Sequence, residues 1–174
     1  MYERVKNTQV PMILIGLGAN LPSPEGPPKD TLAAALAALP REDVAILGRS
    51  RWYRTAPVPH SDQPDFLNGV ISVATAREPA DLLALLHCIE ARFGRVRGAP
   101  NAARTLDLDL LAYHDRVTTG AAGLVLPHPR LHERAFVLLP LAEIAPAWRH
   151  PTLGRTAAEM LAALPPGQEA APLP

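Results

Sequence analysis

The chain has 174 residues, enough for one domain with a substantial core. Its formal net charge is zero and aromatic residues make up 5% of it, so it lacks the basic excess and the stacking side chains typical of nucleic-acid-binding proteins. The single cysteine, Cys88, excludes a disulfide within the chain. We therefore expect a cytoplasmic protein with no nucleic-acid partner, and no apolar run is long enough to predict a membrane span.

The N-terminal part of the chain predicts a strand and then a helix. Residues 1–10 carry charges and precede an apolar run, a combination that resembles a signal peptide. The run is short and an acidic residue lies ahead of it, which favours a buried first strand over residues 12–17. After a loop rich in glycine and proline, residues 31–39 predict a short helix with Asp30 or Thr31 as its N-cap.

The middle of the chain predicts antiparallel strands followed by the clearest helix. Residues 44–58 and 66–76 are strand-like, and a loop rather than a long crossover joins them, so they are expected to be antiparallel neighbours. Residues 79–93 carry apolar side chains at helical spacing. Pro79 suits the first turn of this helix, and Gly94 ends it.

Four further elements are expected towards the C-terminus: strands at 105–114 and 124–126, and helices within 127–146 and 156–164. This order predicts an α+β fold, a ferredoxin-like sandwich with helices over a mainly antiparallel sheet. We expect a single domain over residues 11–164, with tails at 1–10 and 165–174, the latter frayed.

The predicted strand "TLDLDLLAYH" (105–114) carries two like charges. Residues two apart share a face of a strand, so Thr105, Asp107 and Asp109 point one way and the leucines between them point the other. Two carboxylates about 7 Å apart at their Cα atoms can turn towards one point, where a cation or a proton must offset their repulsion. Magnesium bound together with phosphate oxygens is one solution. The alternative is an ordinary solvated face, although aspartate is a poor strand former.

Three arginines precede this strand in a basic loop: Arg95, Arg97 and Arg104. The planar guanidinium suits phosphate, and a loop can bring it down over a ligand as a lid. Solvated charges beside a turn are the alternative. The chain contains no GxxxxGK[ST] motif, and "GLGAN" (16–20) is too weak a glycine pattern to indicate a dinucleotide site.

Together these motifs resemble the 6-hydroxymethyl-7,8-dihydropterin pyrophosphokinase family of folate biosynthesis. The resemblance runs in order through "GLGANL" (16–21), "YRTAPV" (53–58), "QPDFLNGV" (63–70), "IEARFGRVR" (89–97), "RTLDLDLL" (104–111) and "LPHPRLHERAFVLLPLAEIAP" (126–146). It implies an α/β sandwich and an ATP-dependent diphosphotransferase. The implied reaction moves diphosphate from ATP to the pterin hydroxymethyl group and releases AMP.

The resemblance also implies roles for single residues. Asp107 and Asp109 match the acidic pair that binds two magnesium ions. The matching pterin-site residues are Thr55, Val58, Phe66, Asn68 and Phe136, where the two phenylalanines sandwich the ring and Asn68 reads its polar edge. The matching nucleotide-site residues are Glu90, Arg95, Arg97, Arg104, His128 and Arg134, with Arg95 and Arg104 also counted as catalytic.

Some of these residues have simpler interpretations. Phe66 and Phe136 are also compatible with ordinary core packing, and His128 with a cap on the turn beside Pro129. The sequence departs from the family at residues 99–104, "APNAAR", where many members have Trp-Gly-Pro before the arginine and a loop one residue longer. A tryptophan contribution to lid closure is therefore missing, and lid dynamics or nucleotide affinity is expected to differ.

Two other functions remain open from the sequence. One is a different metal-dependent phosphoryl or nucleotidyl transferase on the same architecture, and the other is a non-catalytic ferredoxin-like module, for example for RNA. A degenerate family member that binds pterin without catalysis is a further possibility, which the intact acidic pair disfavours. We expect the protein to be a monomer whose partners are small molecules only.

Overall fold

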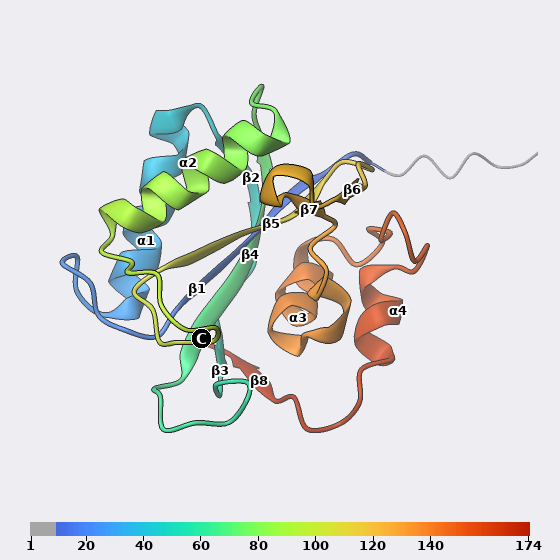
Figure 1. Cartoon of the computed structure of the whole chain (residues 1–174). Coiled ribbons are helices and arrows are strands. Elements are labelled where there is room, and N and C mark those ends of the chain that lie inside the picture. The colour runs from blue at the N-terminus through green and yellow to red at the C-terminus, as the bar shows by residue number, and fades with distance from the viewer. Residues whose placement is uncertain (1–9) are drawn as a thin grey trace, which may run out of the picture.

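A computed structural model of the chain describes residues 10–174, apart from the side chain of Ala122. Residues 1–9, which include nearly all of the predicted N-terminal tail, lie outside the described part. A six-stranded antiparallel sheet runs through the middle, with α1 and α2 over one face and α3 and α4 over the other (Figure 1). The α+β sandwich predicted from the sequence is confirmed.

The sheet is built from strands that are distant in sequence. Its main path runs β5–β1–β4–β3–β8, and β2 also pairs with β4. The strands are β1 (Ile13–Ala19), β2 (Ala45–Arg49), β3 (Tyr53–Thr55), β4 (Phe66–Ala74), β5 (Asp107–Tyr113) and β8 (Ala170–Pro172). A separate two-stranded hairpin is formed by β6 (Thr118–Thr119) and β7 (Val125–Leu126).

Helices α1, α2 and α4 begin where the local sequence supplies a proline or a capping side chain. Their bounds are α1 (Pro28–Ala38), α2 (Pro79–Arg92), α3 (Ala135–Ile144) and α4 (Ala157–Ala162), with 3-10 turns at Leu39–Glu42, Ala121–Gly123 and Leu131–Glu133. Proline occupies the first turn of α2, as expected, and Gly94, at φ +80°, lies just after the end of this helix. Thr156 and Glu159 form a capping box at α4. Among residues 10–174, no helix has both the length and the apolar character to cross a membrane.

Alternation along β1 gives the protein two cores. Ile13, Ile15 and Leu17 pack beneath α1 and α2, together with Leu86 of α2. Leu14 faces the other way and packs in the core beneath α3 and α4. Beyond Leu14, the face of β1 nearer α3 carries only glycines, at positions 16 and 18, so this half of the strand leaves space over the sheet.

Several expected boundaries were wrong in detail. Helix α1 begins at Pro28 rather than after an Asp30 or Thr31 cap, because proline is well suited to the first helical position. Residues 44–58 form two strands, and both pair with β4. Strand β5 begins at Asp107, so Thr105 precedes it.

The C-terminal tail was also predicted wrongly. Residues 165–174 are not frayed, since Ala170–Pro172 pair antiparallel with β3 and the Leu173 amide donates to the Trp52 carbonyl at 2.7 Å. The local sequence, rich in alanine and proline, carries no strand signal, and the pairing partner is more than a hundred residues away in the chain.

Candidate functional site

The floor of the site is the glycine face of β1. This strand lies between β4 and β5, so Gly18 is opposite Asn68 on one side and Asp107 on the other, and Gly16 is opposite Asp109. A Cβ atom added to Gly18 would lie 2.8 Å from Asn68 Oδ1, closer than such contacts allow. The absence of side chains here lets the flanking polar groups lean over β1. The "GLGAN" glycines are therefore strand glycines that open a hollow rather than part of a phosphate-binding turn.

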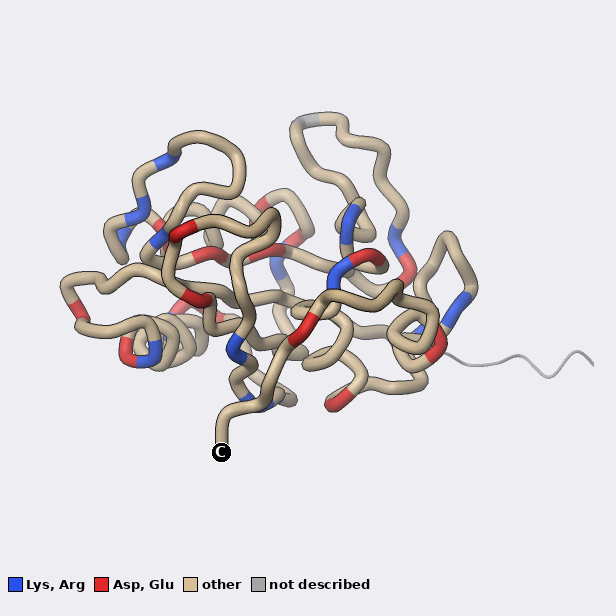
Figure 2. The backbone as a smooth tube through the Cα atoms, turned by 90° about the horizontal axis from the view of Figure 1, so that it is seen from below, with Lys and Arg blue, Asp and Glu red and all other residues tan. Residues whose placement is uncertain are grey.

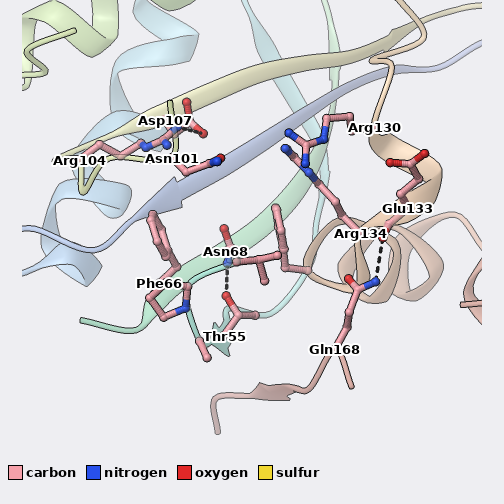
Figure 3. Close-up of a pocket in the computed structure, with 14 residues that line it drawn as sticks. Thr55, Phe66, Asn68, Asn101, Arg104, Asp107, Arg130, Glu133, Arg134 and Gln168 are labelled. Carbon is pink, nitrogen blue, oxygen red and sulfur yellow. Dashed lines mark hydrogen bonds and ion pairs between the residues drawn. The ribbon is translucent and has the colours of Figure 1, made fainter. Parts of the chain in front are cut away.

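A hollow of about 240 Å³ opens beside this floor, between the sheet and the start of α3 (Figure 3). It brings together every residue predicted for the pterin site and three predicted for metal or phosphate. Its side-chain lining includes Thr55, Val58, Phe66, Asn68, Asn101, Arg104, Asp107, Arg130, Glu133, Arg134, Phe136 and Gln168. Asp109 lines a smaller adjoining cleft that shares Asn68, Asp107 and Phe136 with the hollow.

One wall of the hollow offers a buried amide. The Asn68 side chain, 7% exposed, donates from Nδ2 to the Thr55 hydroxyl at 2.7 Å, and these two residues come from the paired strands β4 and β3. No described residue donates to the Asn68 amide oxygen. A fixed amide with a free acceptor beside a hydroxyl is suited to reading a planar heterocycle with both donors and acceptors.

The aromatic side chains of the hollow are each covered by an arginine. The guanidinium of Arg104 lies 6.0 Å from the ring centre of Phe66, and that of Arg134 lies 5.3 Å from the ring centre of Phe136. Both rings are partly exposed and line the hollow, so neither is simply a core residue. A flat ligand between them would replace these cation–π contacts by ring stacking.

Asp107 is held by two arginines. Arg95 Nη1 lies 2.5 Å from Asp107 Oδ1, and Arg104 Nη1 lies 3.1 Å from Asp107 Oδ2. The same Arg95 nitrogen is 2.5 Å from Glu90 Oε1, and that oxygen also accepts from the Leu108 amide at 2.8 Å. The two loop arginines therefore occupy the oxygens of Asp107 in this state.

Glu90 does not line the hollow. It lies on α2 behind β5 and is 3% exposed, and burial raises its pKa, against the lowering effects of the Leu108 amide and Arg95. It touches the site through Arg95, which it holds against Asp107. Its predicted contact with a nucleotide stays a prediction.

The surroundings of Asp109 differ from those of Asp107. Burial and the neighbouring Asp107 charge raise its pKa to about 7, against a lowering effect of Arg134, and no described residue forms a hydrogen bond with its carboxylate. Such a group gains from a cation. No cluster of three or more metal-ligating side chains occurs within residues 10–174. Two carboxylates alone fit Mg²⁺, which keeps water and phosphate oxygens among its ligands.

The loop between α2 and β5 is tied to β1 at its far end. Asn20 is 2% exposed, and its side-chain Oδ1 accepts from the Arg104 backbone amide at 2.9 Å. The backbone amide of Asn20 donates to the Arg104 carbonyl at 3.1 Å. Asn101, at φ +60°, lines the hollow, and its carbonyl accepts from Gln63 Nε2 at 3.0 Å. Residues 99–104, the part of the loop without the expected tryptophan, thus reach the site through Asn101. Arg97 remains exposed in the same loop.

His128 and Arg134 stand on the other side of the acidic pair. Burial, with Arg134 close by, lowers the pKa of His128 to about 4, so its ring is neutral at pH 7. Its Nδ1 accepts from the Arg130 amide at 3.2 Å, which is the turn contact that the simpler interpretation predicted. Burial and Arg130 lower the pKa of Arg134. His128 does not line the hollow, but both Arg130 and Arg134 do.

Sequence reasoning missed several lining residues. Arg130 and Glu133 lie inside the quoted motif "PHPRLHER" and could have been found there, since an unpaired arginine beside a phosphate site is itself a signal. Gln168 had no such signal, because it lies in the segment predicted to be frayed. Gly18 was noticed only as part of a weak glycine pattern.

A family model and several known proteins are similar in sequence to this chain. Residues 14–146 match the family model described as 7,8-dihydro-6-hydroxymethylpterin-pyrophosphokinase (HPPK). A 2-amino-4-hydroxy-6-hydroxymethyldihydropteridine pyrophosphokinase of Pseudomonas aeruginosa is 40% identical over 154 residues, covering 88% of this chain and 91% of that protein. The protein of the same name from Synechocystis sp. is 40% identical over 149 residues, covering 85% and 73%.

The fold is also similar to solved structures. The HPPK-DHPS of Plasmodium falciparum, solved as wild type with pteroate, superposes with a TM-score of 0.62 at 13% identity. The match covers 87% of this chain and 44% of that chain, so this chain spans less than half of the solved protein. At this identity the likeness concerns the fold.

We predict that Asp109→Asn stabilises the metal-free protein and that the gain depends on pH. The native pKa of about 7 exceeds the ordinary aspartate value of 3.8, so wild-type stability falls as pH rises between these values, where the unfolded chain ionises first. Asparagine does not ionise, so the variant has no free-energy penalty from a charge at this position. Its melting temperature in EDTA should therefore exceed that of wild type by more at pH 8 than at pH 4.

Asp107→Asn serves as the matched control, since it removes the partner of Arg95 and Arg104 and should lower the melting temperature at pH 8. If Asp109→Asn changes the melting temperature by the same amount at both pH values, the result would contradict a buried, unpaired charge at Asp109.

Proposed function

The chain belongs to the 7,8-dihydro-6-hydroxymethylpterin-pyrophosphokinase family, and we propose that its hollow binds the pterin while its loop arginines and acidic pair handle ATP. The reaction of the family is the pyrophosphokinase step of folate synthesis, in which ATP is the diphosphate donor. The observation that supports this placement most strongly is the register of three strands, which sets Asn68 and Asp107 on either side of Gly18.

The pterin ring binds between Phe66 and Phe136, with its polar edge against Asn68 and Thr55. The ring displaces the guanidinium groups that cover the two phenylalanines in the ligand-free protein. Val58 closes the outer side of the hollow. In this orientation the hydroxymethyl group points along β1 towards Asp107 and Asp109.

The ATP phosphates bind where the arginines gather. Arg104, Arg130 and Arg134 line the hollow (Figure 3), and Arg95 reaches it through Asp107. We propose that Arg95 and Arg104 leave Asp107 for the phosphates when ATP arrives, which frees the carboxylate. Arg97 and His128 supply further contacts once the loop closes over the nucleotide. Arginine suits this exchange because its fork binds carboxylate and phosphate alike.

Asp107 and Asp109 are the residues that would hold two Mg²⁺ ions at this site. When bound, Mg²⁺ neutralises phosphate oxygens and makes the hydroxyl a better nucleophile. Asp109 favours cation binding because its charge has no other partner, and Asp107 becomes available as its arginines move. The rigid strand fixes the spacing of the two carboxylates.

The chemical step is an in-line displacement at the β-phosphorus. The pterin hydroxyl oxygen forms a bond to this phosphorus and loses its proton, while the bond from the β-phosphorus to the oxygen bridging it to the α-phosphorus breaks. AMP leaves with that oxygen. Arginines around the triphosphate offset the charge that develops on both fragments, and the walls of the hollow align the two reactants.

We further propose a monomeric cytoplasmic enzyme with no nucleic-acid partner. Apart from the arginines around the hollow, basic and acidic residues are interspersed along the chain (Figure 2), and the net charge is zero. Cys88 is free and exposed, which suits a reducing compartment. We also propose that the catalytic domain includes the segment up to Leu173, because β8 belongs to the same sheet.

Product analysis tests the function. Purified protein with ATP, Mg²⁺ and 6-hydroxymethyl-7,8-dihydropterin is expected to form AMP and the pterin diphosphate in equal amounts, because the β-phosphorus is attacked. ADP as the product would favour a different phosphoryl transferase. Binding of pterin without turnover would point to a degenerate, non-catalytic member.

Asp107→Asn and Asp109→Asn are each expected to lower kcat by orders of magnitude, because each removes a charged metal ligand. Circular dichroism checks that the fold is retained, and Asp115→Asn, at an exposed turn after β5, is the matched control that should keep wild-type turnover. Near-normal turnover in either site variant would contradict the metal role of the pair.

Gly18→Ala is expected to raise KM for the pterin about tenfold while the protein still folds. The new Cβ would meet Asn68 Oδ1 at 2.8 Å, so the Asn68 carboxamide must shift and weaken its hydrogen bond to Thr55, while the backbone of the two strands stays in place. Losing one aligned hydrogen bond to the ligand costs about 1–1.5 kcal/mol. Gly98→Ala, where the added atom meets nothing within 4 Å, is the control. An unchanged pterin KM in Gly18→Ala would contradict the role given to Asn68.

A further inference from the structure

The C-terminal segment passes along the rim of the hollow before it joins the sheet. After α4 the chain turns at Gly167, at φ +100°, and then pairs with β3, where Ala170 is opposite Thr55 (Figure 1). A φ of this sign is readily adopted only by glycine. The segment therefore lies against the strand that carries Thr55, on one wall of the hollow.

Gln168 links this segment to the opposite wall. Its Oε1 accepts from the Ala135 amide at 2.9 Å, and its Nε2 donates to the Glu133 carbonyl at 2.9 Å (Figure 3). Ala135 is the first residue of α3, and the first amides of a helix have no partner within it. The residue in the N-cap position, Arg134, provides no side-chain cap. Gln168 thus caps α3 from 33 residues away.

The capped turn carries the residues that face the ligand. Arg134 and Phe136 flank Ala135, and both line the hollow opposite Thr55. The other end of α3 is held separately, since Glu143 accepts from the Tyr53 hydroxyl at 2.6 Å and from the Arg51 amide at 3.0 Å. Loss of Gln168 would therefore loosen the first turn of α3 rather than detach the helix.

We propose that Gln168 is a positioning residue for the pterin. Through the cap on α3 and the pairing of β8 with β3, the segment 168–172 fixes the gap between the Phe136 ring and the Thr55–Asn68 edge. This inference rests on the proposed function, since it assigns that hollow to the pterin. It makes the C-terminal segment part of the substrate site.

The variant Gln168→Met tests the inference, because it keeps the length of the side chain and removes both hydrogen bonds. A lost helix cap costs roughly 1 kcal/mol, so KM for the pterin should rise roughly fivefold. The value of kcat should change less than twofold, and KM for ATP should rise by a smaller factor than KM for the pterin, because Arg134 on the same turn is one of several ATP contacts. Amide hydrogen exchange at Ala135 should accelerate while exchange in the second half of α3 stays as in wild type.

Two further variants sharpen the comparison. Gln168→Glu keeps the acceptor for the Ala135 amide but loses the donor to the Glu133 carbonyl, so its pterin KM should lie between those of wild type and Gln168→Met. Asp115→Asn, at the exposed turn after β5 and outside the lining of the hollow, should behave as wild type.

An unchanged pterin KM in Gln168→Met would overturn the inference, as would an equal rise in KM for the pterin and for ATP. If Gln168→Met fails to fold, the role is structural and the inference also fails. A wild-type protein that makes no AMP would instead reject the proposed function. The Ala135 exchange measurement needs no turnover and still tests the cap.

Discussion

The organisation of this protein depends on the repulsion between two carboxylates on one face of a strand. Asp107 and Asp109 are fixed by the pleat of β5 and cannot move apart without breaking its pairing with β1. The protein offsets the charge of Asp107 with two arginines from the adjacent loop and leaves Asp109 without a hydrogen-bond partner among the described residues. These opposite surroundings support the proposal that a cation relieves Asp109, while phosphate competes for the arginines of Asp107.

The central strand β1 makes this arrangement usable. Its odd-numbered residues belong to the core beneath α1 and α2, whereas glycines at 16 and 18 leave the opposite face open. Side chains at these positions would fill the space between Asn68 and the acidic pair. Asn20 at the end of the same strand binds the backbone of Arg104. One short segment thus provides the floor of the site and anchors the lid.

The opposite wall depends on contacts that hold a single helix at both ends. Helix α3 brings Arg134 and Phe136 to the hollow, and its position is set by Glu143 at one end and by Gln168 at the other. The residues that hold α3, Tyr53 at Glu143 and Gln168 at Ala135, come from β3 and from the C-terminal segment, which are themselves paired. The two walls of the hollow are therefore connected through hydrogen bonds as well as through the core.

The sequence by itself determined the fold class, the acidic pair, the basic loop and the family motifs, because alternation along a strand and residue chemistry are local properties. It could not determine which residues meet across the sheet. The hydrogen bond between Asn20 and the Arg104 amide, the position of Gly18 between Asn68 and Asp107, and the cap that Gln168 provides all join distant segments. The C-terminal strand could not be predicted from the sequence for the same reason. An alanine- and proline-rich segment becomes a strand only where the edge of a sheet, here β3, offers it hydrogen bonds.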